Sequence, residues 1–139
     1  MIVLDTNVLS EASRPAPARR VLYWLAAQQP ARLFTTTISE AEFLYGLALL
    51  PAGKRRTGLE QAARRMFGED FANRVLPFDS AAAHAFALIA AVRRKKGRPI
   101  GDLDAQIAAI ARSHGAAVAT RNVGDFSDCG IDVIDPWTA

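Results

Sequence analysis

The sequence contains only one cysteine, Cys129, so an internal disulfide is excluded. Its two histidines and this single thiol do not form the closely spaced Cys/His groups that bind zinc. No apolar run reaches the roughly 18 residues that would span a bilayer. No basic segment with a cleavage site precedes the first apolar residues. These absences exclude a disulfide-stapled secreted fold, and we expect a cytoplasmic protein without membrane attachment.

The chain also lacks a strong excess of either charge, because 17 basic residues stand against 14 acidic ones, for a net charge of +3. The resulting pI of about 9.5 permits a nucleic-acid partner without requiring one. Half of the 139 residues are apolar and 22% are charged, as in an ordinary globular protein. This length and composition predict a single domain, residues 1–139, with its own hydrophobic core.

Strand-like and helix-like segments alternate along the chain. The expected strands are residues 1–4, 33–37, 74–78, 117–120 and 131–134. The expected helices are residues 6–13, 18–28, 39–50, 54–71, 80–96 and 102–114. Asp79 and Asp102 are the predicted N-caps of the last two helices, and Gly115 is the predicted C-cap of the final one. This alternation predicts an α/β sandwich built around a mostly parallel sheet.

The first charged side chain, Asp5, directly follows an apolar run, residues 2–4. This pattern predicts a buried strand that ends at a carboxylate. Ligands of parallel α/β sheets bind outside the carboxyl ends of the strands, so Asp5 is a candidate site residue. The alternative is that Asp5 or Thr6 only caps the helix that follows.

A second acid, Asp104, interrupts the apolar face of a predicted helix. Ile107, Ala108 and Ala111 follow it on the same face at helical spacing. Because an unpaired charge is expensive to bury, a carboxylate on the core side needs a partner. The alternative is a first-turn acid favoured by the helix dipole, but Asp102 already fits that role.

A third acid, Glu42, shows the same pattern in the helix expected at residues 39–50. It shares a face with Ile38, Tyr45 and Leu49. However, Ser39 and Glu42 also have the spacing of a capping box. Spacing alone therefore leaves both interpretations of Glu42 open.

The strand expected at residues 117–120 ends in polar sequence that includes Asn122, and Asp125 follows three residues later. Ordinary loop chemistry would also account for both. If Asp5, Glu42 and Asp104 converge, a divalent cation is the simplest way to neutralise their like charges. Hard oxygen ligands suit Mg²⁺ or Mn²⁺. Such a site favours hydrolysis at a phosphoryl group.

These segments together resemble the PIN-domain family, specifically its VapC-type and FitB-like ribonuclease toxins of bacterial toxin–antitoxin pairs. The resemblance covers essentially the whole chain, and its strength lies in the order and spacing of several motifs. The matching motifs are Val3–Glu11, Ser39–Gly46, Pro77–Asp79, Ile100–Ala109, and Ala119–Asn122 with Asp125–Phe126. The resemblance implies a PIN-like three-layer sandwich, with a central sheet of four to five mostly parallel strands flanked by helices.

By this resemblance, Asp5, Glu42 and Asp104 match the acidic active-site set of the family. Asp5 and Asp104 match its usual Mg²⁺-ligand positions, and Thr6 resembles the hydroxyl residue that supports the first acid. Asn122 stands where the family often has a fourth acid, so the number of metal ions is open. An amide can orient a water molecule or offer an oxygen to a metal ion, but it adds no charge.

Two further acids, Asp102 and Asp125, are candidates to compensate for this missing charge, although neither matches the family position. The basic run Arg93–Arg98 is a candidate rim that holds substrate phosphates. The alternative is a solvated helix end, because cations are favoured there. The aromatic residues Tyr23, Trp24, Tyr45 and Trp137 are expected in the core or in a dimer interface.

The resemblance implies a metal-dependent endoribonuclease toxin that cleaves RNA, with Mg²⁺ or Mn²⁺ as cofactor. It also implies a homodimer that binds a small cognate antitoxin, with a higher assembly on operator DNA. One alternative is a non-catalytic PIN-like module that only binds RNA or protein. Another is a metal-dependent enzyme outside a toxin–antitoxin pair, such as a DNA nuclease or a phosphatase. A receiver-type domain is disfavoured because Glu42 and Asp104 both interrupt apolar faces.

Overall fold

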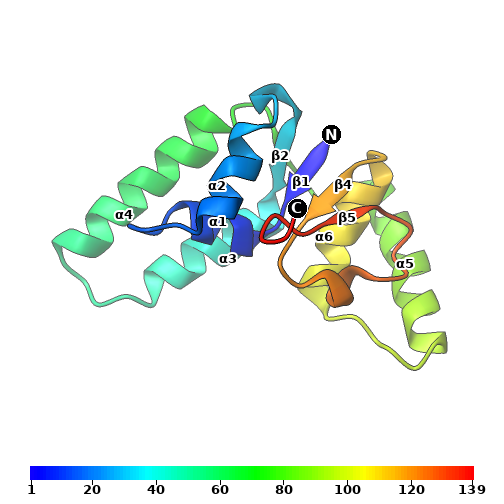
Figure 1. Ribbon diagram of the computed structural model, residues 1–139. Coiled ribbons are helices and arrows are strands. Elements are labelled where there is room, and N and C mark those ends of the chain that lie inside the picture. Colours follow the sequence, from blue (N-terminus) through cyan, green and yellow to red (C-terminus); the bar gives the residue numbers. More distant parts are fainter.

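A five-stranded parallel sheet forms the centre of the computed structural model, which describes residues 1–139 (Figure 1). Its strands, in spatial order, are β3 (Val75–Leu76), β2 (Leu33–Thr36), β1 (Ile2–Leu4), β4 (Ala117–Ala119) and β5 (Val133–Ile134). Every neighbouring pair runs parallel. The predicted α/β sandwich is confirmed, with strands shorter than the sequence pattern predicts.

Helices cover both faces of the sheet. One group is α1 (Thr6–Ala12), α2 (Arg19–Ala26), α3 (Thr37–Ala48) and α4 (Lys54–Arg65), and the other is α5 (Ser80–Lys95) and α6 (Asp102–Ser113). The central strand β1 contributes to two hydrophobic cores, because alternate side chains point to opposite faces. Val3 packs into the core with α5 and α6, whereas Ile2 and Leu4 pack into the core with the first group. None of the helices combines the length and apolar character needed to cross a membrane.

Two predicted helix starts are wrong. Helix α3 begins at Thr37, and its N-cap is Thr36, whose hydroxyl accepts a hydrogen bond from the Ser39 amide at 3.0 Å. The proposed Ser39–Glu42 capping box therefore does not form, because the last residue of β2 caps the helix earlier in the chain. Similarly, Gly101 is the N-cap of α6, and Asp102 lies in its first turn without capping it.

The other predicted helix ends agree with the structure in part. The Asp79 carboxylate accepts a hydrogen bond from the Ala82 amide at 3.0 Å and so caps α5. The C-cap of α6 is His114, one residue before the predicted Gly115, and Gly115 follows it with a φ of 64°, which glycine adopts without a steric penalty. The helix expected at residues 54–71 is divided into α4 and a π-helical turn, Met66–Asp70.

The strand order places two carboxyl ends next to each other. Leu4 of β1 pairs with Ala119 of β4, and the Asp5 amide donates to the Ala119 carbonyl at 2.9 Å. The residues that follow these strands, Asp5 and Thr120, are therefore neighbours although 115 positions separate them.

Candidate active site

The carboxylate of Asp5 is held at the end of β1 by hydrogen bonds to both oxygens. One oxygen accepts the Thr6 amide at 2.8 Å, which makes Asp5 the N-cap of α1. The other oxygen accepts the Thr120 hydroxyl at 2.8 Å and the Asn7 side-chain amide at 3.0 Å. Asp5 thus caps a helix and also belongs to a polar network that spans two strands. It is only 5% exposed.

Thr120 is the hydroxyl residue that supports Asp5, and the expectation that Thr6 does so is wrong. The Thr120 hydroxyl donates to Asp5 and accepts from the Asn7 side chain at 3.2 Å and the Asn122 amide at 3.1 Å. The Thr6 hydroxyl instead donates to the Glu42 carboxylate at 2.8 Å. The cause is the parallel pairing of β1 with β4, which brings Thr120 beside Asp5.

Glu42 reaches the site from α3, although not for the reason that the apolar pattern predicts. Tyr45 and Leu49, which continue its helical face, are 66% and 67% exposed, so this face is not buried in the core. Glu42 is half-buried, and its carboxylate is oriented by the hydrogen bond from Thr6. The side chain is therefore directed toward the end of β1.

Asp104 extends the buried face of α6, as the sequence predicts. Ile107, Ala108 and Ala111 on that face are fully buried, whereas Asp104 is partly open to solvent. Burial raises the pKa of the Asp104 carboxyl to about 6, and the charges of Asp5, Asp125 and Glu42 add to the effect. The neighbouring acids thus repel the ionised form of Asp104.

Burial also raises the pKa of Asp5. Hydrogen bonds from Thr120, Thr6 and Asn7 oppose this effect, and the charge of Asp125 adds to it. Since Asp125 acts on both Asp5 and Asp104, it supplies negative charge close to the site that Asn122 does not. The charge of Asp102 is not among the main causes of either pKa shift.

The acids converge on one open groove of about 500 Å³. Its lining is almost entirely polar and comprises Asp5, Thr6, Asn7, Ser10, Glu11, Arg14, Glu42, Asp104, Arg121, Asn122 and Trp137. All four predicted site residues, Asp5, Glu42, Asp104 and Asn122, are in this set. The two proposed compensating acids, Asp102 and Asp125, are not.

The sequence interpretation missed several residues of the lining. Asn7, Ser10 and Glu11 share one face of α1, so their helical spacing from the first motif could have indicated them. Glu11 is 6% exposed, and its carboxylate accepts the Ala18 amide at 3.0 Å and contacts Arg14 at 3.3 Å. Arg121 directly precedes the predicted Asn122, so the polar sequence after β4 could have indicated it. No local signal indicates Trp137, because only the fold brings the C-terminal segment to the groove.

The donor set fits a hydrated Mg²⁺ or Mn²⁺ ion better than a preformed cage. No three His, Cys, Asp or Glu side chains are grouped closely enough to enclose a metal ion by themselves. Mg²⁺ usually keeps several waters and binds one or two carboxylates, and Asp5 and Asp104 offer such oxygens in an open groove. A bound cation would also relieve the repulsion that raises the pKa of Asp104.

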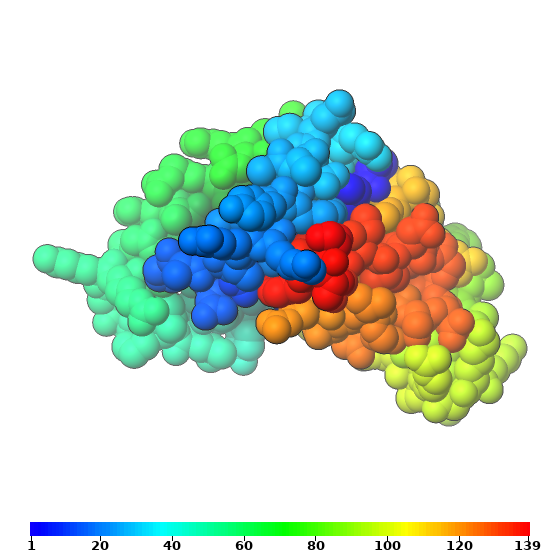
Figure 2. Space-filling view, in the orientation of Figure 1, coloured from blue at the N-terminus to red at the C-terminus, as the bar shows by residue number.

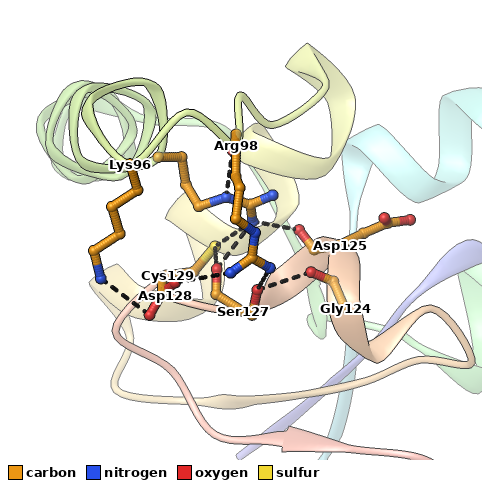
Figure 3. A network of polar contacts seen from close by, with 8 residues as sticks. Lys96, Arg98, Gly124, Asp125, Ser127, Asp128 and Cys129 are labelled. Carbon is orange, nitrogen blue, oxygen red and sulfur yellow. Dashed lines mark hydrogen bonds and ion pairs between the residues drawn. The ribbon is translucent and has the colours of Figure 1, made fainter.

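Three members of the basic run Arg93–Arg98, which begins in the last turn of α5, contact the loop that follows Asn122. Arg93 is 5% exposed, and its guanidinium donates to the carbonyls of Arg98, Asp125 and Ser127 at 2.7–2.9 Å. Lys96 and Arg98 contact Asp128 at 3.2 and 3.3 Å (Figure 3). These three side chains therefore secure the loop, and neither the phosphate-binding nor the solvated interpretation holds for Arg93.

Comparison with known proteins agrees with this fold. Residues 2–130 match the PIN domain family, and the chain belongs to that family. The chain is 44% identical over 137 residues to the VapC ribonuclease Y4jK of Sinorhizobium fredii, covering 99% of this chain and 98% of the relative. It is 39% identical over 137 residues to toxin FitB of Neisseria gonorrhoeae, with 99% of each chain covered. A solved structure of FitAB bound to an IR36 DNA fragment has a TM-score of 0.93 at 39% identity, over 99% of this chain and 96% of that chain.

Proposed function

We propose that the protein is a metal-dependent endoribonuclease toxin that hydrolyses RNA phosphodiester bonds and is neutralised by a small cognate antitoxin. One observation carries the proposal: Asp5, Glu42 and Asp104 reach a single open groove from three different elements. Their mutual repulsion and partial burial favour the binding of a divalent cation. The names of the relatives Y4jK, a ribonuclease, and FitB, a toxin, support this assignment.

The residues of the groove have distinct roles in the proposed reaction. When bound, Mg²⁺ or Mn²⁺ stabilises negative charge on the phosphate and lowers the pKa of water. Asp5 and Asp104 would hold the ion through their carboxylate oxygens. Glu42, fixed by Thr6, binds the ion or positions the attacking water, and Asn122 orients water or phosphate through its amide. Attack by water leaves 5′-phosphate and 3′-hydroxyl ends.

The test is cleavage of a labelled single-stranded RNA by the purified protein, with Mg²⁺ or with EDTA. We expect Asp5→Asn and Asp104→Asn to reduce metal-dependent cleavage to background. Asp102→Asn removes the same charge from the same turn of α6 but outside the groove, and it should keep activity. Full metal-dependent cleavage by either site variant would refute the assignment.

The same assay separates the alternatives. RNA binding without cleavage, unaffected by EDTA, would indicate a non-catalytic PIN-like module. Preferential cleavage of single-stranded DNA would indicate a nuclease with another substrate. If the wild-type protein cleaves RNA but is not neutralised by the product of an adjacent small gene, it is a ribonuclease outside a toxin–antitoxin pair.

A second groove supports an antitoxin partner. It has a volume of about 510 Å³, and 13 of its 15 lining residues are hydrophobic, contributed mainly by α1, α2, α3 and α4. Helix α1 separates the two grooves, since Val8 and Leu9 line the apolar one while Ser10 and Glu11 line the acidic one. An apolar segment of the antitoxin that binds here would lie beside the acids. The FitAB neighbour, solved on DNA, supports a higher assembly with the antitoxin on operator DNA.

Exposed apolar side chains support the proposed homodimer. On α5, Leu88 is 57% exposed and Val92 is 40% exposed, and the two are one helical turn apart. We expect Leu88→Glu to shift the protein toward monomer in sedimentation experiments without weakening antitoxin binding. Ala12→Glu in the apolar groove should weaken antitoxin binding and leave the oligomeric state unchanged. If both variants behave as wild type in both assays, the two surfaces are not interfaces.

A further inference from the structure

One wall of the acidic groove pairs a cation with an aromatic ring. The guanidinium of Arg121 lies 5.1 Å from the ring centroid of Trp137, and both side chains line the groove. Arg121 is exposed and forms no salt bridge. The other cation of the lining, Arg14, contacts Glu11 at 3.3 Å. Arg121 is thus the only positive charge of the groove without a carboxylate partner.

The C-terminal segment holds Trp137 in place. The Trp137 amide donates to the Asp135 carboxylate at 2.9 Å, and the Ala139 amide donates to the Asp135 carbonyl at 2.9 Å. Pro136 is fully buried, and the Trp137 side chain packs against the hydrophobic core beneath α1 and α2. Figure 2 shows this segment, in red, between the blue N-terminal helices and the orange segment near residue 120. The aromatic ring is therefore held in a fixed position in the wall of the groove.

Arg121 is also tied to the first acid through its backbone. Its amide donates to the Asn7 side-chain oxygen at 3.2 Å, and the Asn7 nitrogen donates to Asp5 at 3.0 Å. Two hydrogen bonds thus fix the position of the Arg121 backbone relative to Asp5. The ring of Trp137 restrains the other end of the side chain, so the guanidinium is held at the wall of the groove that the acids also line.

We propose that Arg121 binds a backbone phosphate of the RNA next to the phosphate that is cleaved, and that Trp137 positions its guanidinium. A guanidinium stacked on an aromatic face keeps its N–H edges free for two parallel hydrogen bonds to phosphate oxygens. An acid-lined groove otherwise repels the polyanion, so an unpaired cation on its wall is suited to hold the substrate. This inference rests on the proposed ribonuclease function.

Steady-state cleavage of a labelled single-stranded RNA with Mg²⁺, over a range of KCl concentrations, tests the proposal. We expect Arg121→Gln to raise KM about tenfold while kcat changes little, because a charge-assisted contact to the substrate is lost. The slope of log(kcat/KM) against log[KCl] should become shallower by about 0.7, the value for one phosphate contact on a single strand. The matched control is Arg55→Gln, which removes the same charge at an exposed position of α4, outside the groove.

Further variants separate binding from folding. Trp137→Phe keeps an aromatic face and should remain close to wild type, whereas Trp137→Leu should raise KM. Arg121→Lys keeps the charge and should restore the salt slope but only part of the affinity. If Arg121→Gln loses its circular dichroism signal because it does not fold, the KM values of Arg121→Lys and Trp137→Leu decide whether Arg121 binds the substrate phosphate. A KM and salt slope equal to those of Arg55→Gln, or a fall in kcat alone, would overturn the proposal.

The two hypotheses fail in different ways. If the wild-type protein does not cleave RNA, the proposed function fails in this same assay. Fluorescence anisotropy with the Asp104→Asn protein and the same RNA then still measures the phosphate contact. Equal affinity with and without the added Arg121→Gln change would overturn the role of Arg121 independently of catalysis.

Discussion

The ionised carboxylate of Asp104 should destabilise the metal-free protein at neutral pH. Its pKa is raised from 3.8 to about 6, so the folded state binds this proton more tightly than the unfolded state. As the pH rises from about 4 to about 6, the unfolded chain releases the proton first and stability falls. Above about 6 the destabilisation is constant. Replacement by neutral Asn should therefore stabilise the fold at neutral pH and have little effect near pH 4.

The size of this destabilisation follows from the pKa shift of Asp104. The change from 3.8 to about 6 corresponds to roughly 3 kcal/mol at about 1.4 kcal/mol per pKa unit. Because Asp104 is partly open to solvent, screening reduces this to about 1–1.5 kcal/mol. For a chain of this size, that gain raises the melting temperature by roughly 3–5 °C. Asp102→Asn removes a favourable first-turn charge and should lower stability slightly.

Thermal unfolding with EDTA, measured at several pH values, checks this prediction. The reasoning is refuted if Asp104→Asn is no more stable than the wild type at neutral pH, or if its gain is equally large near pH 4. Addition of Mg²⁺ should reverse the order, since the ion binds the wild-type folded state in preference to the variant. Such a reversal would link the destabilising charge directly to the proposed metal site.

Four other substitutions test the loop after Asn122 and the polar contacts of the acidic groove. Arg93→Met should lower the free energy of urea unfolding by roughly 3 kcal/mol, because three backbone carbonyls lose their buried donor. Lys96→Gln, which breaks only an exposed ion pair, should cost less than about 1 kcal/mol. Thr120→Val should cost roughly 2 kcal/mol and reduce RNA cleavage, since Asp5 loses a donor and two N–H groups lose their acceptor. Equal cleavage by this variant and the wild type would remove Thr120 from the site. Asn122→Asp should raise the affinity for Mg²⁺ in calorimetry, and unchanged affinity would show that Asn122 does not face the ion.

Much of the site could be predicted from local sequence. Asp5 follows an apolar strand, and Asp104 continues the buried face of α6. The neighbouring residues in the sequence are therefore enough to predict where each acid lies. The prediction for Glu42 identified the correct residue for a partly wrong reason. Tyr45 and Leu49 on its face are exposed, and it is a hydrogen bond from Thr6 that orients the carboxylate.

The errors at Thr6 and Arg93 share a cause, which is contact between residues far apart in the chain. Thr6 was the nearest hydroxyl in sequence, but Thr120 is the nearest in space because β4 lies beside β1. Arg93 belongs to a basic run that local rules assign to solvent. The fold instead buries it against carbonyls more than 30 residues away.

The sequence by itself determined the order of the elements of this PIN-domain chain and the positions of Asp5 and Asp104 at element ends. Periodicity and capping act over a few residues, so they can be recognised without a fold. Only the tertiary structure decided which hydroxyl supports Asp5 and where the charge of Arg93 is placed. It also decided that Trp137, at the end of the chain, completes the wall of the groove. The physical reason is that strand order and parallel pairing determine these contacts. Neither can be recognised from residues that are close together in the sequence.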